Sequence, residues 1–207
     1  MNIKNKILSF LISLLLISSL YGQNDNTMEN KNKETATLGA GCFWCVEAVF
    51  QSLKGVESVT SGYSGGNVKN PSYREVTTGN TGHAEAIQIK FNPDVISYKE
   101  ILEVFWRTHD PTTLNQQGPD IGSQYRSVIF YHSEEQKKIA EKSKKDADTS
   151  GYFDDSIVTS IEPFKNFYVA EEYHQDFYKK NPNQPYCQFR INPKIKKLEN
   201  EFQEYLK

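Results

Sequence analysis

The chain has 207 residues, of which 37% are apolar and 13% aromatic, and its formal net charge at pH 7 is -2. This length fits one domain plus a short targeting segment better than two full domains, and the apolar fraction is sufficient for a core. Acidic and basic residues are spread along the chain, so the sequence lacks the basic stripe expected of a nucleic-acid-binding protein.

Residues 1–22 have the pattern of a secretory signal peptide. Lys4 and Lys6 form a short positive lead, and an apolar run over residues 7–20 follows it. The small Gly22 then precedes a polar stretch, which is the order of charged, hydrophobic and cleavage regions in a signal peptide. The apolar run is shorter than the roughly 20 residues that a membrane span needs.

This pattern divides the chain into a signal peptide at 1–22, a flexible linker at 23–33 and one domain at 34–207. We therefore expect an exported protein, periplasmic or extracellular, with an uncleaved N-terminal membrane anchor as the alternative. The chain has three cysteines, whereas a disulfide-stabilised secreted scaffold normally has an even and larger set. The cysteine count therefore favours redox chemistry over a structural use.

The domain begins with elements that surround the first two cysteines. The pattern predicts a strand at 36–38 and a helix at 44–53. Gly55 ends that helix in the left-handed conformation that helix ends favour. A strand at 56–63 leads into a glycine-rich turn. Residues 84–91 alternate in polarity, which is the period of a half-buried strand.

The clearest helix begins at Ser97, because Ser97 and Glu100 fit a capping box and apolar residues then recur on one face. Beyond it, the sequence predicts a strand at 125–132, a helix at 134–148, a strand at 157–162, a helical stretch at 169–178 and a last helix at 193–205. These elements follow no regular βαβ rhythm, so the predicted class is α+β. The loop at 109–124 is long for a compact domain, and such loops are often functional. Asp120 lies in it, where a lone carboxylate is usually solvated.

Cys42 is the most informative residue, because it lies where the first strand ends and the first helix begins. Backbone N–H groups and the helix dipole at that point stabilise a thiolate and lower its pKa. The thiolate is the nucleophile, so the placement indicates a reactive cysteine, with a buried structural cysteine as the alternative. Phe43 and Trp44 follow at once. They could hold a small apolar group such as a thioether methyl, or they could be ordinary core.

Cys42 and Cys45 also form a C-x-x-C pair, which is typical of thioredoxin-like thiol oxidoreductases. Phe-Trp between them and the absence of a regular βαβ context argue against that class. The four histidines are scattered and no second close cysteine pair exists, so no metal site is indicated. A secreted binding module with structural cysteines is the non-enzymatic alternative.

Glu85 lies at the head of the strand predicted at 84–91, among apolar residues. A carboxyl group in such surroundings tends to have a raised pKa and can hold a proton near neutral pH. A solvated charge at a strand end is the alternative. Tyr73 and Tyr125 offer hydroxyl groups that could polarise an oxygen atom, although most tyrosines in such a chain simply pack.

Several short motifs occur in a fixed order along the domain. They are Gly41-Cys-Phe-Trp, Gly62-Tyr-Ser-Gly-Gly, Pro71-Ser-Tyr-Arg-Glu-Val, Gly82-His-Ala-Glu, Phe105-Trp with His109-Asp-Pro, and Gln124-Tyr-Arg-Ser. Together they resemble the A-type peptide methionine sulfoxide reductases over residues 37–193. The resemblance implies an α+β domain with a mixed central sheet flanked by helices, which we expect to have a ferredoxin-like core. It also implies reduction of the S-epimer of methionine sulfoxide, free or in oxidised proteins, with no metal or organic cofactor.

The resemblance also implies a role for each candidate residue. It assigns the nucleophile to Cys42, the substrate-methyl pocket to Phe43 and Trp44, the proton donor to Glu85, hydrogen bonds to the sulfoxide oxygen to Tyr73 and Tyr125, and ordering of the site to Asp120. The reaction would leave Cys42 as a sulfenic acid. Because sulfoxide oxygen is a poor leaving group unless it is protonated, a neutral carboxyl group beside the nucleophile fits this chemistry.

Two cysteines could resolve that sulfenic acid as a disulfide. Cys45 stands where many relatives have glycine, and Cys187 resembles the mobile C-terminal resolving position. Cys187 follows two prolines in a segment that we expect to move, which favours it as the first resolver, with Cys45 passing the disulfide on. The reverse order is left open. Thioredoxin or an exported thioredoxin-like reductant would close the cycle, and a monomer suits an enzyme that must admit methionines on large partners.

Overall fold

The computed structural model describes residues 33–207. The predicted signal peptide at 1–22 lies outside the described residues, and so does the predicted linker except for Lys33. Within residues 33–207, no helix is both long and apolar enough to cross a bilayer.

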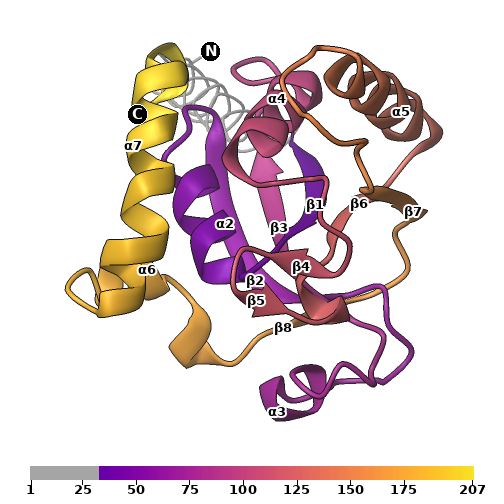
Figure 1. Cartoon of the computed structure of the whole chain (residues 1–207), viewed down its shortest axis with the longest axis vertical. Coiled ribbons are helices and arrows are strands. Elements are labelled where there is room, and N and C mark those ends of the chain that lie inside the picture. The colour runs from indigo at the N-terminus through magenta and orange to yellow at the C-terminus, as the bar shows by residue number, and fades with distance from the viewer. Residues whose placement is uncertain (1–32) are drawn as a thin grey trace, which may run out of the picture. The chain divides into compact units, whose positions relative to one another are not determined.

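A six-stranded sheet forms the centre of the domain, in the order β7-β6-β1-β3-β2-β8 (Figure 1). Its strands are β1 (Glu34–Ala40), β2 (Val56–Ser64), β3 (Ala84–Phe91), β6 (Ser127–Tyr131), β7 (Ser160–Pro163) and β8 (Phe167–Val169). All neighbours pair antiparallel except β6 and β7, which are parallel, so the sheet is mixed.

Two helices complete the core arrangement, α2 (Phe43–Gln51) after β1 and α4 (Tyr98–Thr108) after β3. The order β1-α2-β2-β3-α4-β6 is the β-α-β-β-α-β pattern of ferredoxin-like folds. The predicted α+β class, mixed sheet and ferredoxin-like core are therefore confirmed.

The remaining elements surround this core. They are α3 (Tyr73–Val76), the hairpin of β4 (Gln116–Gln117) and β5 (Asp120–Ile121), η1 (Ser123–Tyr125), α5 (Glu134–Asp148), η2 (Glu172–His174), α6 (Phe177–Lys180), η3 (Cys187–Ile191), α7 (Asn192–Glu201) and η4 (Gln203–Tyr205). In Figure 1, α7 runs beside α2, with which it is in contact. The C-terminal segment therefore returns to the helix that follows the first strand.

Strand β3 serves two apolar layers, because successive side chains of a strand point to opposite faces of the sheet. Ile87 and Ile89 belong to the main core with α2 and α4, whereas Ala84 and Ala86 belong to a smaller cluster on the other face. Glu85 shares the orientation of Ile87 and Ile89. The register of β3 therefore turns this carboxyl group towards α2.

The capping box predicted at the start of α4 is confirmed. The backbone N–H of Glu100 donates to Oγ of Ser97 at 3.3 Å, and the backbone N–H of Ser97 donates to Oε2 of Glu100 at 2.7 Å. Both side chains thus satisfy N–H groups that have no partner within the helix.

The second half of the domain differs from the sequence prediction at several points. The helical stretch predicted at 169–178 is wrong at its start, because Phe167–Val169 form the edge strand β8 beside β2. The predicted last helix begins earlier, since a π-helical turn at Cys187–Ile191 runs directly into α7. The backbone N–H of Asn192 donates to the Cys187 carbonyl oxygen five residues earlier, which is the wider spacing of a π-helical turn, and Pro193 follows at the start of α7.

Candidate active site

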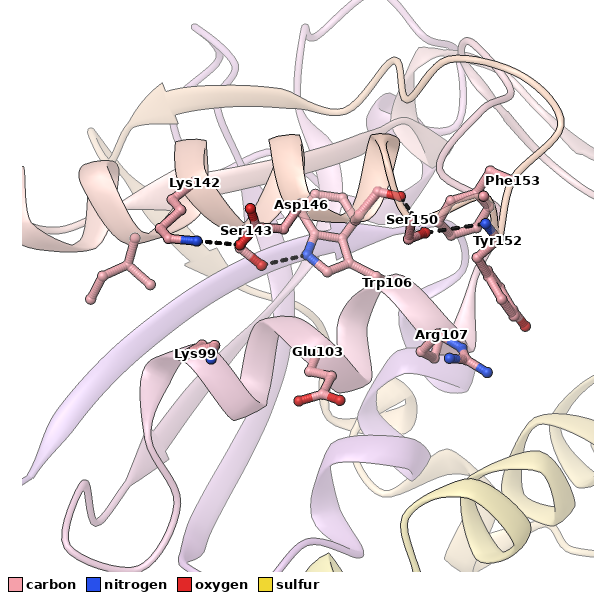
Figure 2. A pocket seen from close by; sticks show the side chains of 13 residues that line it. Lys99, Glu103, Trp106, Arg107, Lys142, Ser143, Asp146, Ser150, Tyr152 and Phe153 are labelled. Carbon is pink, nitrogen blue, oxygen red and sulfur yellow. Dashed lines mark hydrogen bonds and ion pairs between the residues drawn. The ribbon is translucent and has the colours of Figure 1, made fainter.

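A cavity of about 770 Å³ lies between α4 and α5 (Figure 2). Trp106 forms part of its wall, and its indole N–H donates to Oγ of Ser143 at 2.7 Å. None of the predicted site residues lines this cavity. The chemistry indicated by the sequence therefore lies elsewhere, around Cys42.

Cys42 occupies the N-cap position of α2, directly after the turn that ends β1. The turn is made by Gly41, whose φ of 86° lies in the left-handed region that favours glycine. A Cβ atom on Gly41 would lie 2.5 Å from Cγ of Gln117 in β4. Glycine therefore permits both the turn and the close approach of the β4-β5 hairpin to Cys42.

Glu85 lies against the first turn of α2 and is only 1% exposed. Its Oε2 accepts a hydrogen bond from the backbone N–H of Phe43 at 3.0 Å. Burial raises the pKa of Glu85 to about 8, although the Phe43 N–H opposes this, and the charges of Asp120 and Cys45 add to the rise. The direction is the one expected from the sequence, and the carboxyl group is therefore mainly protonated at pH 7.

The thiol of Cys42 differs from the sequence expectation. Burial raises the pKa of Cys42 well above its ordinary value, and the neighbouring Cys45 thiol and the Glu85 charge raise it further. The helix start does not compensate, because the N–H of Phe43 at the first helical position is bonded to Glu85. The prediction of a lowered pKa is therefore wrong for the resting protein, in which Cys42 keeps its proton.

Aromatic rings form one wall beside Cys42. Phe43 is 1% exposed and stacks on Tyr73 with ring centroids 6.5 Å apart. Trp44 stacks on Phe177 at 3.6 Å, and its indole N–H donates to Nδ1 of His174 at 3.1 Å. The two residues predicted to hold a methyl group are thus fixed in orientation by partners that the sequence reading missed, His174 and Phe177.

Tyr73 and Tyr125 come together near Glu85 from different parts of the chain. Burial raises the pKa of Tyr73 to about 12 and also raises the pKa of Tyr125, and the charges of Glu85 and Cys42 contribute to both. The backbone N–H of Tyr73 donates to Oε1 of Glu171 at 2.8 Å, which fixes the start of α3. Within residues 33–207, neither tyrosine hydroxyl has a hydrogen-bond partner. Both hydroxyl groups keep their protons and are free to donate.

Asp120 lines the same cavity as Cys42 and lies beside Tyr186, a residue that the sequence did not single out. The hydroxyl of Tyr186 donates to Oδ2 of Asp120 at 3.2 Å and lies 3.7 Å from Sγ of Cys45. A cavity of about 210 Å³ at this place is lined by Ala40, Cys42, Cys45, Gln117, Asp120, Tyr186, Phe189, Arg190, Pro193 and Lys194. Tyr186 directly precedes Cys187 in the sequence. This neighbouring position is the sequence signal that could have identified Tyr186 as a site residue.

Cys187 does not line that cavity. It is fully buried at the start of the π-helical turn, and burial raises its pKa. The sequence placed it in a segment expected to move, whereas the structure places it in a buried helical turn. All three cysteines are free thiols.

His109 has a structural role. His109 is buried, and its ring nitrogens pair with the Phe105 carbonyl at 2.6 Å and with Oγ of Ser127 at 2.7 Å. Burial lowers the pKa of His109 to about 3, so it serves as a neutral structural residue. Among residues 33–207, no group of three or more His, Cys, Asp or Glu side chains is arranged to hold a metal ion.

Comparisons with known proteins point to one family. The family model described as peptide methionine sulfoxide reductase matches residues 34–206. The chain is 55% identical over 170 residues to the peptide methionine sulfoxide reductase MsrA of Natronomonas pharaonis, which covers 82% of this chain and 96% of that protein. It is 59% identical over 169 residues to MsrA of Sulfolobus acidocaldarius, with 82% and 95% covered.

Solved structures point to the same family. The fold matches the reduced form of Mxr1 from Saccharomyces cerevisiae with a TM-score of 0.69 and 39% identity, covering 75% of this chain and 90% of that one. It also matches methionine sulfoxide reductase A of Corynebacterium diphtheriae with a TM-score of 0.66 and 32% identity, covering 76% and 80%.

The raised pKa of Glu85 predicts how stability depends on pH. The folded-state pKa of about 8 exceeds the ordinary value, so the contribution of Glu85 to stability is complete below about pH 4 and is lost as pH rises to about 8. Glu85→Gln removes this titration. We expect the variant to gain about 3 kcal/mol in free energy of unfolding relative to the parent between pH 5 and pH 8. Urea unfolding at several pH values measures the difference.

The exposed Glu141→Gln is the matched control and should follow the parent at every pH. A constant difference between the Glu85→Gln variant and the parent over this range would show that Glu85 titrates normally in the folded protein.

Proposed function

The chain belongs to the peptide methionine sulfoxide reductase family, and we propose that Cys42 and Glu85 carry out the reduction of methionine sulfoxide in it. The observation that supports this assignment is the neutral, buried carboxyl group of Glu85, bonded to the first N–H of α2 directly after Cys42. A thiol and a carboxylic acid at one helix start can act together on a polar S–O bond.

In the proposed reaction, the Cys42 sulfur attacks the sulfoxide sulfur while Glu85 protonates the sulfoxide oxygen. The proton of the Cys42 thiol passes to the Glu85 carboxylate, and the oxygen ends on Cys42 as a sulfenic acid. The S–O bond of the substrate breaks, an S–O bond forms on Cys42, and methionine leaves. The substrate sulfur gains the two electrons that the Cys42 sulfur loses.

The remaining site residues orient the sulfoxide. Phe43 and Trp44 provide an apolar wall for the methyl group, and the free hydroxyls of Tyr73 and Tyr125 donate to the oxygen without being ionised. A chiral sulfur can direct its methyl to this wall and its oxygen to Glu85 in only one configuration. We assign the S-epimer, which is the epimer that the A-type reductases take.

The cycle closes by disulfide formation. Asp120 orders the cavity that Cys42 and Cys45 share, because it accepts a hydrogen bond from Tyr186. We propose that Cys45 and Cys187 resolve the sulfenic acid and that thioredoxin, or an exported thioredoxin-like protein, reduces the resulting disulfide. The substrates are methionine sulfoxide residues in oxidised proteins, and the chain acts as a monomer in the repair of those proteins.

Reduction in a single turnover tests the assignment. The pre-reduced protein, given a peptide with one methionine sulfoxide, should form methionine from the S-epimer only. Cys42→Ser should abolish the reaction, and Glu85→Gln should slow it by about 100-fold or more because the proton donor is lost. Quantification of methionine by chromatography measures the yield and the rate.

The C-x-x-C pair makes a general thiol oxidoreductase the competing function. If Glu85→Gln reduced the S-epimer as fast as the parent, or if the protein formed no methionine yet exchanged disulfides with a test protein, the assignment would fail.

We also propose that the protein is exported, on the strength of the sequence of residues 1–22 alone. Cleavage after the apolar run would release a chain that begins near Gln23. Mass spectrometry of the protein isolated from its producing cell should find that N-terminus in the fraction outside the cytoplasmic membrane. A chain that begins at Met1 in the cytoplasm would contradict export.

A further inference from the structure

One face of α2 holds a segment from late in the chain, residues 171–177. The indole N–H of Trp44 donates to Nδ1 of His174 at 3.1 Å. One turn further along the helix, the buried Glu47 accepts hydrogen bonds from the backbone N–H of Phe177 at 3.3 Å and from that of the preceding residue at 3.1 Å. Residues three apart on a helix are neighbours on its surface. These bonds therefore fasten the segment to the helix that begins beside the nucleophile.

The same segment is also bound to β2 and to the start of α3. The side-chain amide of Gln175 accepts from the backbone N–H of Ser61 and donates to its carbonyl oxygen, both at 3.0 Å. Oε1 of Glu171 accepts from the backbone N–H of Tyr73 at 2.8 Å. His174 lies between these two anchors and is only 1% exposed. Its ring is therefore held in one place.

The His174 ring stands at the centre of the aromatic wall. The ring centroids of Phe43, Trp44 and Tyr73 lie 4.9, 5.6 and 4.5 Å from its own centroid. In the proposed reaction, the first two of these rings receive the methyl group and the third donates to the sulfoxide oxygen. One histidine thus packs against both parts of the substrate site.

The bond with Trp44 requires one protonation state of His174. An indole N–H can only donate, so Nδ1 must have a free lone pair and the neutral ring carries its hydrogen on Nε2. Burial lowers the pKa of His174, and the charge of Glu171, whose Oε2 lies 4.0 Å from Nε2, opposes this. The rings of Tyr73 and Tyr173 also face it. The ring is therefore neutral at pH 7 and accepts the bond.

Trp44 has a second partner, which leaves one degree of freedom to the bond with His174. Phe177 stacks on Trp44 with centroids 3.6 Å apart and ring planes at 6°. Such a stack fixes the plane of the indole, but it still allows the ring to turn within that plane. The bond from the N–H edge to His174 prevents this turn. The two contacts together give Trp44 a single position.

We propose that His174 is a positioning residue for the reduction, and that its bond to Trp44 makes the site selective for an S-methyl group over larger S-alkyl groups. The inference rests on the function proposed above and deepens it. One extra methylene in an apolar pocket is worth roughly 10- to 200-fold in discrimination, provided that the pocket keeps its shape. Without the bond, the indole can turn, so the wall admits a larger group and holds the methyl group less firmly.

Two replacements of His174 separate the hydrogen bond from packing. His174→Asn keeps an acceptor oxygen near the place of Nδ1, because both atoms are bonded to Cγ. His174→Leu has an apolar side chain of similar size and leaves the Trp44 N–H without its acceptor. His132→Leu is the matched control, because it makes the same change at a histidine that bonds to Thr37 and stacks on Phe164.

Single-turnover reduction is followed with peptides that carry the S-epimer of methionine sulfoxide or of ethionine sulfoxide, over a range of concentrations. For the methyl substrate, His174→Leu should raise the half-saturating concentration about fivefold to thirtyfold and keep the maximal rate within about threefold of the parent, because a buried donor loses its partner while Cys42 and Glu85 stay in place. The preference for methyl over ethyl should fall about tenfold. His174→Asn should restore both quantities, and His132→Leu should match the parent.

The NMR signal of the Trp44 indole N–H tests the bond without any substrate. The chain has two tryptophans, so Trp106→Phe assigns the signal of Trp44. Hydrogen bonding moves an N–H proton downfield. The signal should therefore move upfield in His174→Leu and stay near its parent position in His174→Asn. An unchanged signal in His174→Leu would show that the bond does not form.

Methionine formed by the parent protein separates the two proposals. If the parent forms no methionine from the S-epimer, the proposed function fails. If methionine forms but His174→Leu keeps the half-saturating concentration and the methyl preference of the parent, the function stands and His174 has no positioning role. A His174→Asn variant that behaves like His174→Leu would also contradict that role, because packing rather than the acceptor atom would then be decisive.

Discussion

The contact between the Glu85 carboxyl group and the first turn of α2 governs the chemistry of this domain. An N–H at a helix start normally stabilises an anion, and here the N–H of Phe43 is bonded to Glu85 at 3.0 Å. Burial outweighs that bond, so the carboxyl group stays protonated near neutral pH. The same burial keeps the Cys42 thiol protonated. The Cys42 thiol and the Glu85 carboxyl group are therefore both uncharged in the resting protein.

The fold provides this contact through two features of the sheet. The register of β3 turns Glu85 towards the main core together with Ile87 and Ile89. Gly41 allows β1 to turn into α2 within two residues, with the β4-β5 hairpin packed close by. Elements from the rest of the chain then complete the site around Cys42. They form the aromatic wall and the cavity with Tyr186, and these two are in contact, because the Trp44 and Tyr186 rings meet edge to face with centroids 5.5 Å apart.

Much of this arrangement is readable from the sequence, and the exceptions have physical causes. The alternating polarity of residues 84–91 predicts both the strand and the raised pKa of Glu85, since both depend on the local sequence pattern. The direction of the pKa shift of Cys42 could not be predicted from the sequence, because it depends on burial and on which group accepts the hydrogen bond from the N–H of Phe43. Tyr186 and the buried position of Cys187 depend on the packing of α7 against α2. That is a contact between distant parts of the chain, which no local pattern records.

Direct titration of Glu85 tests the central claim, that a neutral carboxyl group lies beside Cys42. The measurement is the ¹³C NMR shift of the side-chain carboxyl carbons in protein labelled at glutamate, with Glu85→Gln to assign the signal. The account predicts one carboxyl signal that titrates with a midpoint near pH 8 and disappears in the variant. A midpoint for Glu85 in the ordinary range for glutamate would contradict the account, because the carboxyl group would then be ionised at neutral pH and could not protonate the sulfoxide.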